Sequence, residues 1–82
     1  MDIDNKDFKV LIAKAERIID AMTKDYMLNG FSFHQYYIDK EKGIIISHLG
    51  NSKKDLEIRF VPSMIRIEVY INGKLNNVKI IK

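Results

Sequence analysis

The hydrophobic pattern of the chain changes its period once, near Gly30, and this change constrains the fold more than any other feature. Before Gly30, apolar residues recur every three or four positions, which is the spacing of one helical face. They are Phe8, Leu11, Ile12, Ala15, Ile18, Ile19, Met22 and Tyr26. After Gly30, β-branched and aromatic residues stand in short alternating runs separated by turn residues. The pattern therefore predicts one N-terminal helix followed by a β-sheet.

The predicted helix has signals at both of its ends. Asp4 or Asn5 can serve as the N-cap, and Asp7 in the first turn interacts favourably with the helix dipole. Asn29-Gly30 supplies a left-handed stop at the C-terminal end. We expect a helix of about 22 residues, which is about 33 Å long.

The rest of the chain predicts five strands with short connections between them. The strands are expected at residues 31–38, 44–49, 56–61, 64–71 and 74–81. Short connections favour antiparallel pairing of consecutive strands in a meander. The expected fold is α+β, with one long N-terminal helix packed on one face of a five-stranded antiparallel meander sheet. We expect a single domain over residues 1–82.

Two turns predict the register of the last three strands. Asn72-Gly73 is typical of a type I′ hairpin turn, which sets Ile67 opposite Val78. Pro62-Ser63 is taken as a second two-residue connection. The core face under the helix is then expected to contain Leu56, Ile58, Phe60, Ile65, Ile67, Val69, Val78 and Ile80.

The first hairpin is expected to turn at residues 39–43, with Gly43 in the left-handed conformation. This turn sets Ile38 opposite Ile45. One side of the hairpin then carries His34, Tyr36, Ile38, Ile45 and Leu49. We assign this side to the sheet face that points away from the helix.

A helix about 10 Å wide cannot cover both faces of a five-stranded sheet. We therefore expect the second face to be a protein interface, because contiguous exposed apolar surface usually marks one. Its predicted anchors are Tyr36, Ile38, Ile45, Tyr70, Leu75 and Ile81. The alternative is a sheet that coils strongly around the helix and buries several of these residues. In topology the order of elements resembles cystatin-like folds, in which a helix packs on a meander.

The predicted registers also place three basic side chains in a row across three strands: Arg59, Arg66 and Lys79. Such a row could contact a phosphate backbone, with Lys53 and Lys54 as flanking contacts. The alternative, which we favour, is a checkerboard in which Glu57 and Glu68 neutralise the arginines. No cluster of basic residues without interspersed acids occurs in the sequence.

The residue types that catalysis and metal binding require are scarce. The chain has no cysteine and only two histidines, His34 and His48. The preferred register puts the two imidazoles on opposite faces, whereas a slip that pairs Ile38 with Ile44 would let them face each other. Two imidazoles alone make an incomplete zinc site. We find no nucleophile elbow and no phosphate-binding glycine loop, so we expect no enzyme, no metal and no cofactor.

Composition places the chain among small cytoplasmic proteins. Fourteen basic and eleven acidic residues give a net charge of +3, and 46% of the residues are hydrophobic. The charged start of the chain and the absence of cysteine favour a cytoplasmic location, with no signal peptide and no membrane contact. Isoleucine and lysine, with 14 and 11 copies, have A/T-rich codons, which indicates an AT-rich genome. Small chains without motifs from such genomes are often accessories of phages or mobile elements.

These features together predict a non-enzymatic interaction module. It is expected to bind a target protein, as an accessory or inhibitor of a phage or mobile element, or to associate with a second copy as a homodimer. The alternative function is that of a small basic nucleic-acid-binding protein that uses the row of Arg59, Arg66 and Lys79.

Overall fold

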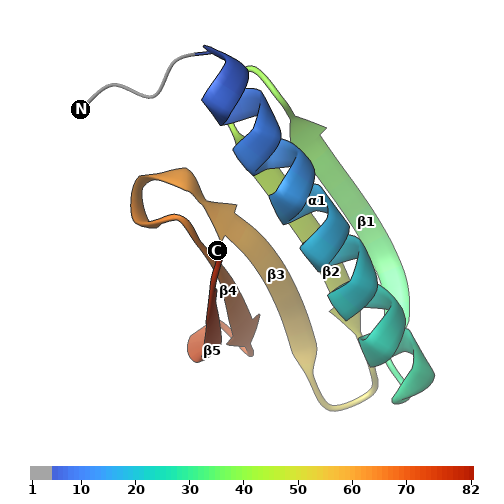
Figure 1. Ribbon diagram of the computed structural model, residues 1–82. Coiled ribbons are helices and arrows are strands. Elements are labelled where there is room, and N and C mark those ends of the chain that lie inside the picture. Colours follow the sequence, from blue (N-terminus) through green and yellow to red (C-terminus); the bar gives the residue numbers. More distant parts are fainter. Residues whose placement is uncertain (1–4) are drawn as a thin grey trace.

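The computed structural model describes residues 5–82 and contains one long helix and a five-stranded sheet (Figure 1). Helix α1 spans Asn5–Leu28. The strands are β1 (Ser32–Asp39), β2 (Ile44–Gly50), β3 (Asp55–Val61), β4 (Arg66–Ile71) and β5 (Lys74–Ile80). All neighbours pair antiparallel in the order β1-β2-β3-β4-β5. The predicted α+β fold, with its helix on a meander sheet, is confirmed.

The C-terminal end of α1 is closed by a left-handed cap, as predicted. Gly30 has a φ of +95°, and its N–H donates to the carbonyl of Met27 at 3.3 Å. The N–H of Phe31 donates to the carbonyl of Tyr26 at 3.1 Å. The rings of Tyr26 and Phe31 meet edge to face with centroids 5.6 Å apart, which adds the apolar contact typical of such caps. The N-cap predicted at Asp4 lies outside the described residues.

The core lies between α1 and one face of the sheet. Ile12, Ala15 and Ile19 form the buried stripe of the helix. The sheet contributes Ile45, Leu49, Leu56, Ile58, Phe60, Ile67, Val69 and Ile81. Between the two layers, the hydroxyls of Thr23 and Ser47 are hydrogen-bonded at 2.8 Å, so both buried oxygens are satisfied.

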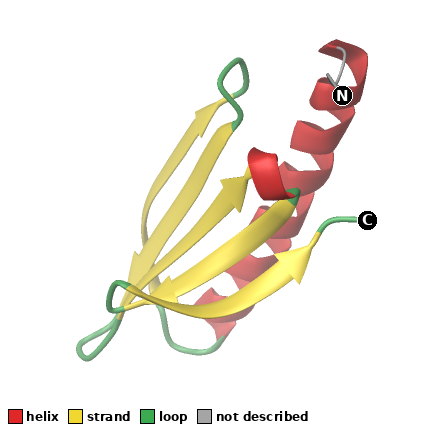
Figure 2. Ribbon diagram, turned by 90° about the vertical axis from the view of Figure 1, so that its left-hand side faces the viewer, coloured by secondary structure: helices red, strands yellow, loops and turns green. Residues whose placement is uncertain are grey.

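The opposite face of the sheet is left uncovered by the described residues. In Figure 2, α1 runs along one side of the twisted sheet.

None of the helices formed by the described residues combines the length and the apolar character that a membrane-spanning helix requires.

The register predicted for the first hairpin is confirmed from the turn as far as Gln35, but the face assigned to the hairpin is wrong. Ile38 lies opposite Ile45, as expected. The pairing of β2 with β3 sets Ser47 opposite Ile58, which belongs to the core. Because side chains alternate along a strand, Ile45 and Leu49 also point toward α1.

Three of the predicted interface anchors therefore lie on the helix side of the sheet. Ile45 is fully buried, and Tyr36 and Ile38 pack against the core. Burial, together with the carboxylates of Asp20 and Glu16 on α1, raises the pKa of Tyr36 to about 12. For these residues the alternative of a sheet that coils around the helix is the correct description.

The register predicted for the last hairpin holds only next to its turn. Tyr70 lies opposite Leu75, but a bulge follows, and the next pair joins Val69 to Asn77. Asn76 has no partner residue in this register. A single inserted residue reverses the side on which every later side chain of β5 points.

The reversal corrects several predictions about β5. Ile81 was expected on the second face, but it is 6% exposed and belongs to the core. Its neighbour Ile80 was expected in the core, but it is 54% exposed. Val78 lies opposite Glu68 rather than Ile67, so it also leaves the predicted core face. Lys79 takes the position opposite Ile67, on the helix side of the sheet.

The connection between β3 and β4 is longer than predicted. Pro62–Met64 forms a short 3-10 helix, η1, and Ile65 follows it with a φ of +49°. Phe60 therefore pairs with Ile67, and Ile65 is 39% exposed instead of buried. Since the connection gains an even number of residues, the core face of β3 and β4 stays as predicted.

Candidate binding face

The open face is the sheet face that points away from α1. Alternation along the observed registers assigns its members. They include His34, Gln35, Tyr37, Ile46, His48, Asp55, Glu57, Arg59, Arg66, Glu68, Tyr70, Leu75, Val78 and Ile80. Several of its apolar side chains are about half exposed, namely Tyr37 at 49%, Leu75 at 50% and Ile80 at 54%.

A hollow of about 550 Å³ lies on the open face. It is lined by Gln35, Tyr37, Ile46, His48, Asp55, Glu57, Arg59, Tyr70 and Gly73. These residues come from four strands and from the β4–β5 turn, which contributes Gly73. Hollows of this size with a few convergent polar groups are common binding sites.

A connected polar network runs across β3 and β4 beside the hollow. Arg59 Nη2 donates to Glu57 Oε2 at 2.6 Å, and its guanidinium carbon lies 5.2 Å from the ring centroid of Tyr70. Tyr70 donates its hydroxyl hydrogen to Glu68 Oε1 at 2.7 Å, and Arg66 Nη2 donates to Glu68 Oε2 at 2.5 Å. The network fixes the side chains on this part of the face.

The same contacts shift two pKa values in opposite directions. The hydroxyl of Tyr70 and the guanidinium of Arg66 stabilise the carboxylate of Glu68, so the pKa of Glu68 is lowered. The carboxylate of Glu68 holds the phenol proton, so the pKa of Tyr70 is raised. Both shifts result from hydrogen bonds within the network.

The row of three basic residues does not exist in the structure. Lys79 points to the helix side, away from Arg59 and Arg66. Each arginine forms an ion pair with a glutamate two positions away on its own strand, Arg59 with Glu57 and Arg66 with Glu68. The checkerboard alternative is therefore confirmed, although the pairs run along the strands rather than diagonally across them.

The two histidines meet on the open face, which the preferred register did not predict. A bulge in β1 between Phe33 and Gln35 brings the rings of His34 and His48 to a centroid distance of 5.5 Å. The His34 ring lies over Gly50, where a Cβ would meet its Nε2 at 2.8 Å. His48 Nε2 is hydrogen-bonded to Asp55 Oδ1. Among the described residues, no group of three histidine, cysteine or acidic side chains is arranged to hold a metal ion.

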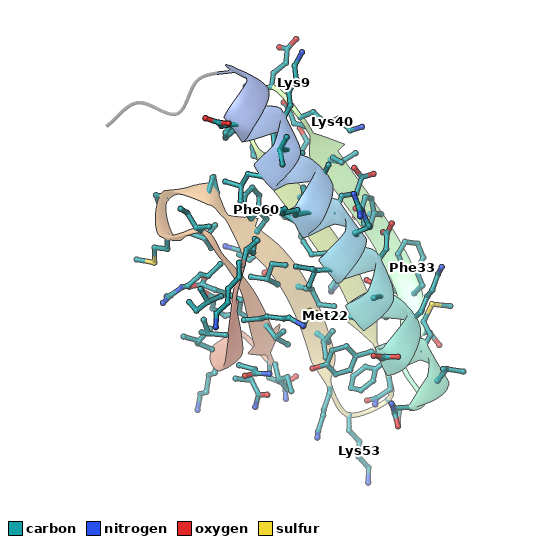
Figure 3. All side chains as sticks on the ribbon, viewed as in Figure 1. Lys9, Met22, Phe33, Lys40, Lys53 and Phe60 are labelled. Atoms are coloured by element: carbon teal, nitrogen blue, oxygen red, sulfur yellow. The ribbon has the colours of Figure 1, made fainter. Side chains whose placement is uncertain are left out.

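Lys53 and Lys54 lie at one end of the sheet, in the β2–β3 turn (Figure 3, where Lys53 is labelled). Their backbone N–H groups donate to Asn51 Oδ1 at 2.9 and 2.7 Å, which fixes the turn. The turn lies beside the β4–β5 turn, because Asp55 N–H donates to Asn72 Oδ1 at 2.8 Å. Both lysines are exposed and lie outside the lining of the hollow.

Only two of the six predicted anchors, Tyr70 and Leu75, lie on the open face, where they form a cross-strand pair. Sequence patterns did not predict three other apolar members of the open face: Tyr37 and Ile46, on the other side of the first hairpin, and Ile80, beyond the bulge. The consecutive asparagines at positions 76 and 77 interrupt the alternation of β5 and are the sequence signal that could have indicated the bulge.

No family model matches the chain. Comparisons with curated proteins and with solved structures also found no match.

Proposed function

We propose that the protein is a non-enzymatic interaction module that binds a protein partner through its open face. The observation that carries the proposal is the set of half-exposed apolar side chains there, Tyr37, Leu75 and Ile80, on a sheet face that no described element covers. Tyr37 on β1 lines the hollow, and Leu75 and Ile80 lie across the sheet on β5. Half-exposed apolar side chains together with a hollow on one face are features of a docking surface.

The edges of the sheet are poorer candidates for the contact. A partner strand that adds to β5 would meet the bulge at Asn76, and the N–H of Val78 already donates to Asn77 Oδ1 at 2.9 Å. β5 also carries Lys74 and Lys79 and no acidic residue. Bulges and lysines are the usual means of preventing edge-to-edge pairing. β1, the other edge strand, has a bulge at His34.

This function fits a cytoplasmic accessory or inhibitor protein of a phage or mobile element, which the abundance of isoleucine and lysine and the absence of cysteine favour. The partner is a target protein or a second copy of the chain. Size-exclusion chromatography with light scattering over a concentration series tests the homodimer. A pull-down with the immobilised protein tests the target.

Two substitutions on the open face decide whether this face makes the contact. Tyr70→Asp and Leu75→Asp should each abolish self-association or partner capture and leave the far-UV circular dichroism unchanged. Leu28→Asp is the matched control, because Leu28 is 85% exposed at the end of α1. If both open-face variants behave like wild type, the proposal is wrong.

A second candidate, nucleic-acid binding, is supported by three lysines rather than by the predicted row. Lys53 and Lys54 on the β2–β3 turn and Lys74 at the start of β5 are exposed, and none of them forms an ion pair with an acid of the described residues. Three phosphate contacts would make the logarithm of the affinity for a single strand fall with the logarithm of salt at a slope of about −2. A Lys53→Glu, Lys54→Glu variant should lose this binding, whereas an Arg59→Ala, Arg66→Ala variant should keep it.

A further inference from the structure

The hollow on the open face differs in charge from the rest of the chain. Its lining contains two carboxylates, Asp55 and Glu57, and one guanidinium, Arg59. If His48 is counted as neutral, one guanidinium and two carboxylates give the lining a net charge of −1, whereas the whole chain, counted in the same way, has a net charge of +3. The hollow is thus a place where acidic groups outnumber basic ones on a basic protein.

Each of the two carboxylates keeps one oxygen available. Asp55 uses Oδ1 for His48, and Glu57 uses Oε2 for Arg59. Asp55 Oδ2 and Glu57 Oε1 accept no hydrogen bond from the described residues. An ionised carboxylate can accept at both oxygens, so each can still bind a charged donor.

The apolar part of the lining suits a long aliphatic stem. Ile46 lies opposite Tyr37 on one side and opposite Arg59 on the other, and Glu57, opposite His48, is the next open-face residue along β3, two positions away. A side chain that crosses Ile46 beside the ring of Tyr37 therefore reaches the carboxylates with its tip. The ring of Tyr70 already carries the guanidinium of Arg59 at 5.2 Å, so stacking of a cation on tyrosine occurs on this face.

We infer that the hollow binds an arginine or lysine side chain of the protein partner, with its stem over Ile46 and its cationic head at Glu57 and Asp55. The inference rests on the proposed function and specifies the chemistry of the partner. An anion is disfavoured because it would meet two carboxylates and a guanidinium that Glu57 already neutralises. Lys53 and Lys54 do not line the hollow, and their charge is screened over about 8 Å at physiological ionic strength.

The test uses the full chain, labelled with ¹⁵N, and three acetylated tripeptide amides. The probes are Gly-Arg-Gly, the neutral isostere Gly-citrulline-Gly and the anionic Gly-Glu-Gly. The arginine peptide should shift the amide resonances of Ile46, Glu57 and Gly73 in a saturable way. The citrulline and glutamate peptides should shift them much less at the same concentrations.

Two variants locate the binding groups. Glu57→Gln should weaken the arginine peptide about two- to fivefold, which is the range for an exposed ion pair. Tyr37→Leu, which keeps an apolar side chain and removes the ring, should weaken it about twofold or more. Glu41→Gln is the matched control, since it removes one carboxylate from the exposed β1–β2 turn and should leave the affinity unchanged.

Three outcomes would overturn the inference: equal shifts with citrulline and arginine, an unchanged affinity in Glu57→Gln, or stronger binding of a decathymidylate than of the arginine peptide at the same resonances. If partner capture still depends on Leu75 while the arginine peptide fails to bind, the open face is an interface but the hollow does not take a basic side chain. If partner capture is insensitive to both Tyr70→Asp and Leu75→Asp, the proposed function itself is wrong.

Discussion

Ile80 and Ile81 provide a stringent test of the bulge in β5, because two identical neighbouring residues are assigned to opposite sides of the sheet. Ile81 is 6% exposed, and its N–H donates to the carbonyl of Ile65 at 3.0 Å. Ile80 is 54% exposed opposite Arg66. A register without the bulge exchanges the two roles, since Ile80 then faces the core.

The expected losses of stability follow from burial. Ile81→Ala removes three buried carbon groups at about 0.8 kcal/mol each, which is about 2.4 kcal/mol, and the cavity left behind raises the total to about 3 kcal/mol. Ile80→Ala removes carbon groups that are already half in water and leaves no cavity, so it should cost about 1 kcal/mol or less. The difference is a large fraction of the stability of a domain of this size.

Urea unfolding followed by circular dichroism measures both variants under the same conditions. The midpoint should fall much further for Ile81→Ala than for Ile80→Ala, with similar slopes for both. Equal losses of stability in the two variants would show that Ile80 and Ile81 do not lie on opposite sides of the sheet as described. A larger loss for Ile80→Ala would show that β5 continues without a bulge and that the open face has been assigned wrongly.

Three further substitutions test the core, the first turn and the polar network. Thr23→Val should lower the free energy of unfolding, measured in urea, by about 1 to 2 kcal/mol, because it leaves the buried hydroxyl of Ser47 without its partner. Adding Ser47→Ala should lower it by less than Thr23→Val alone does, since the pair is already broken. Gly43→Ala should destabilise the protein by about 1 to 3 kcal/mol, because Gly43 has a φ of +70° and a Cβ would lie 2.7 Å from the ring of Phe8. Because the pKa of Glu68 is lowered in the folded state, its carboxylate stabilises the fold above its ordinary pKa of 4.5, and this contribution is lost as the pH falls through the lower folded value. Glu68→Gln should therefore make the free energy of unfolding fall less steeply with decreasing pH. An unchanged acid dependence would contradict this role.

The elements of this fold follow from local signals that the sequence carries openly. The three-and-four spacing from Phe8 to Tyr26 predicts α1, and Asn29-Gly30 predicts its end. Asn72-Gly73 correctly pairs Tyr70 with Leu75. Each of these signals involves residues that are close in sequence, so no tertiary information is needed to interpret them.

The two faces of the sheet could not be assigned in the same way. Which side of β2 faces α1 depends on its register with β3, and no local turn signal fixes that register across residues 51–54. The bulges at His34 and Asn76 each insert one residue, and one residue reverses the side of all that follow. The bulge in β5 therefore misplaced Ile81 and Lys79, and the wrong face of β2 misplaced His48, although their strands were predicted correctly.

The most direct test of the open face as a binding surface is photo-crosslinking in the native host. A photoreactive phenylalanine analogue replaces Tyr37, which is 49% exposed beside the hollow, or Ala21, which is exposed on α1. We predict a discrete adduct from position 37 that disappears when Leu75→Asp is added, and no such adduct from position 21. Identical adducts from the two positions, or an adduct from position 37 that persists with Leu75→Asp, would contradict this prediction.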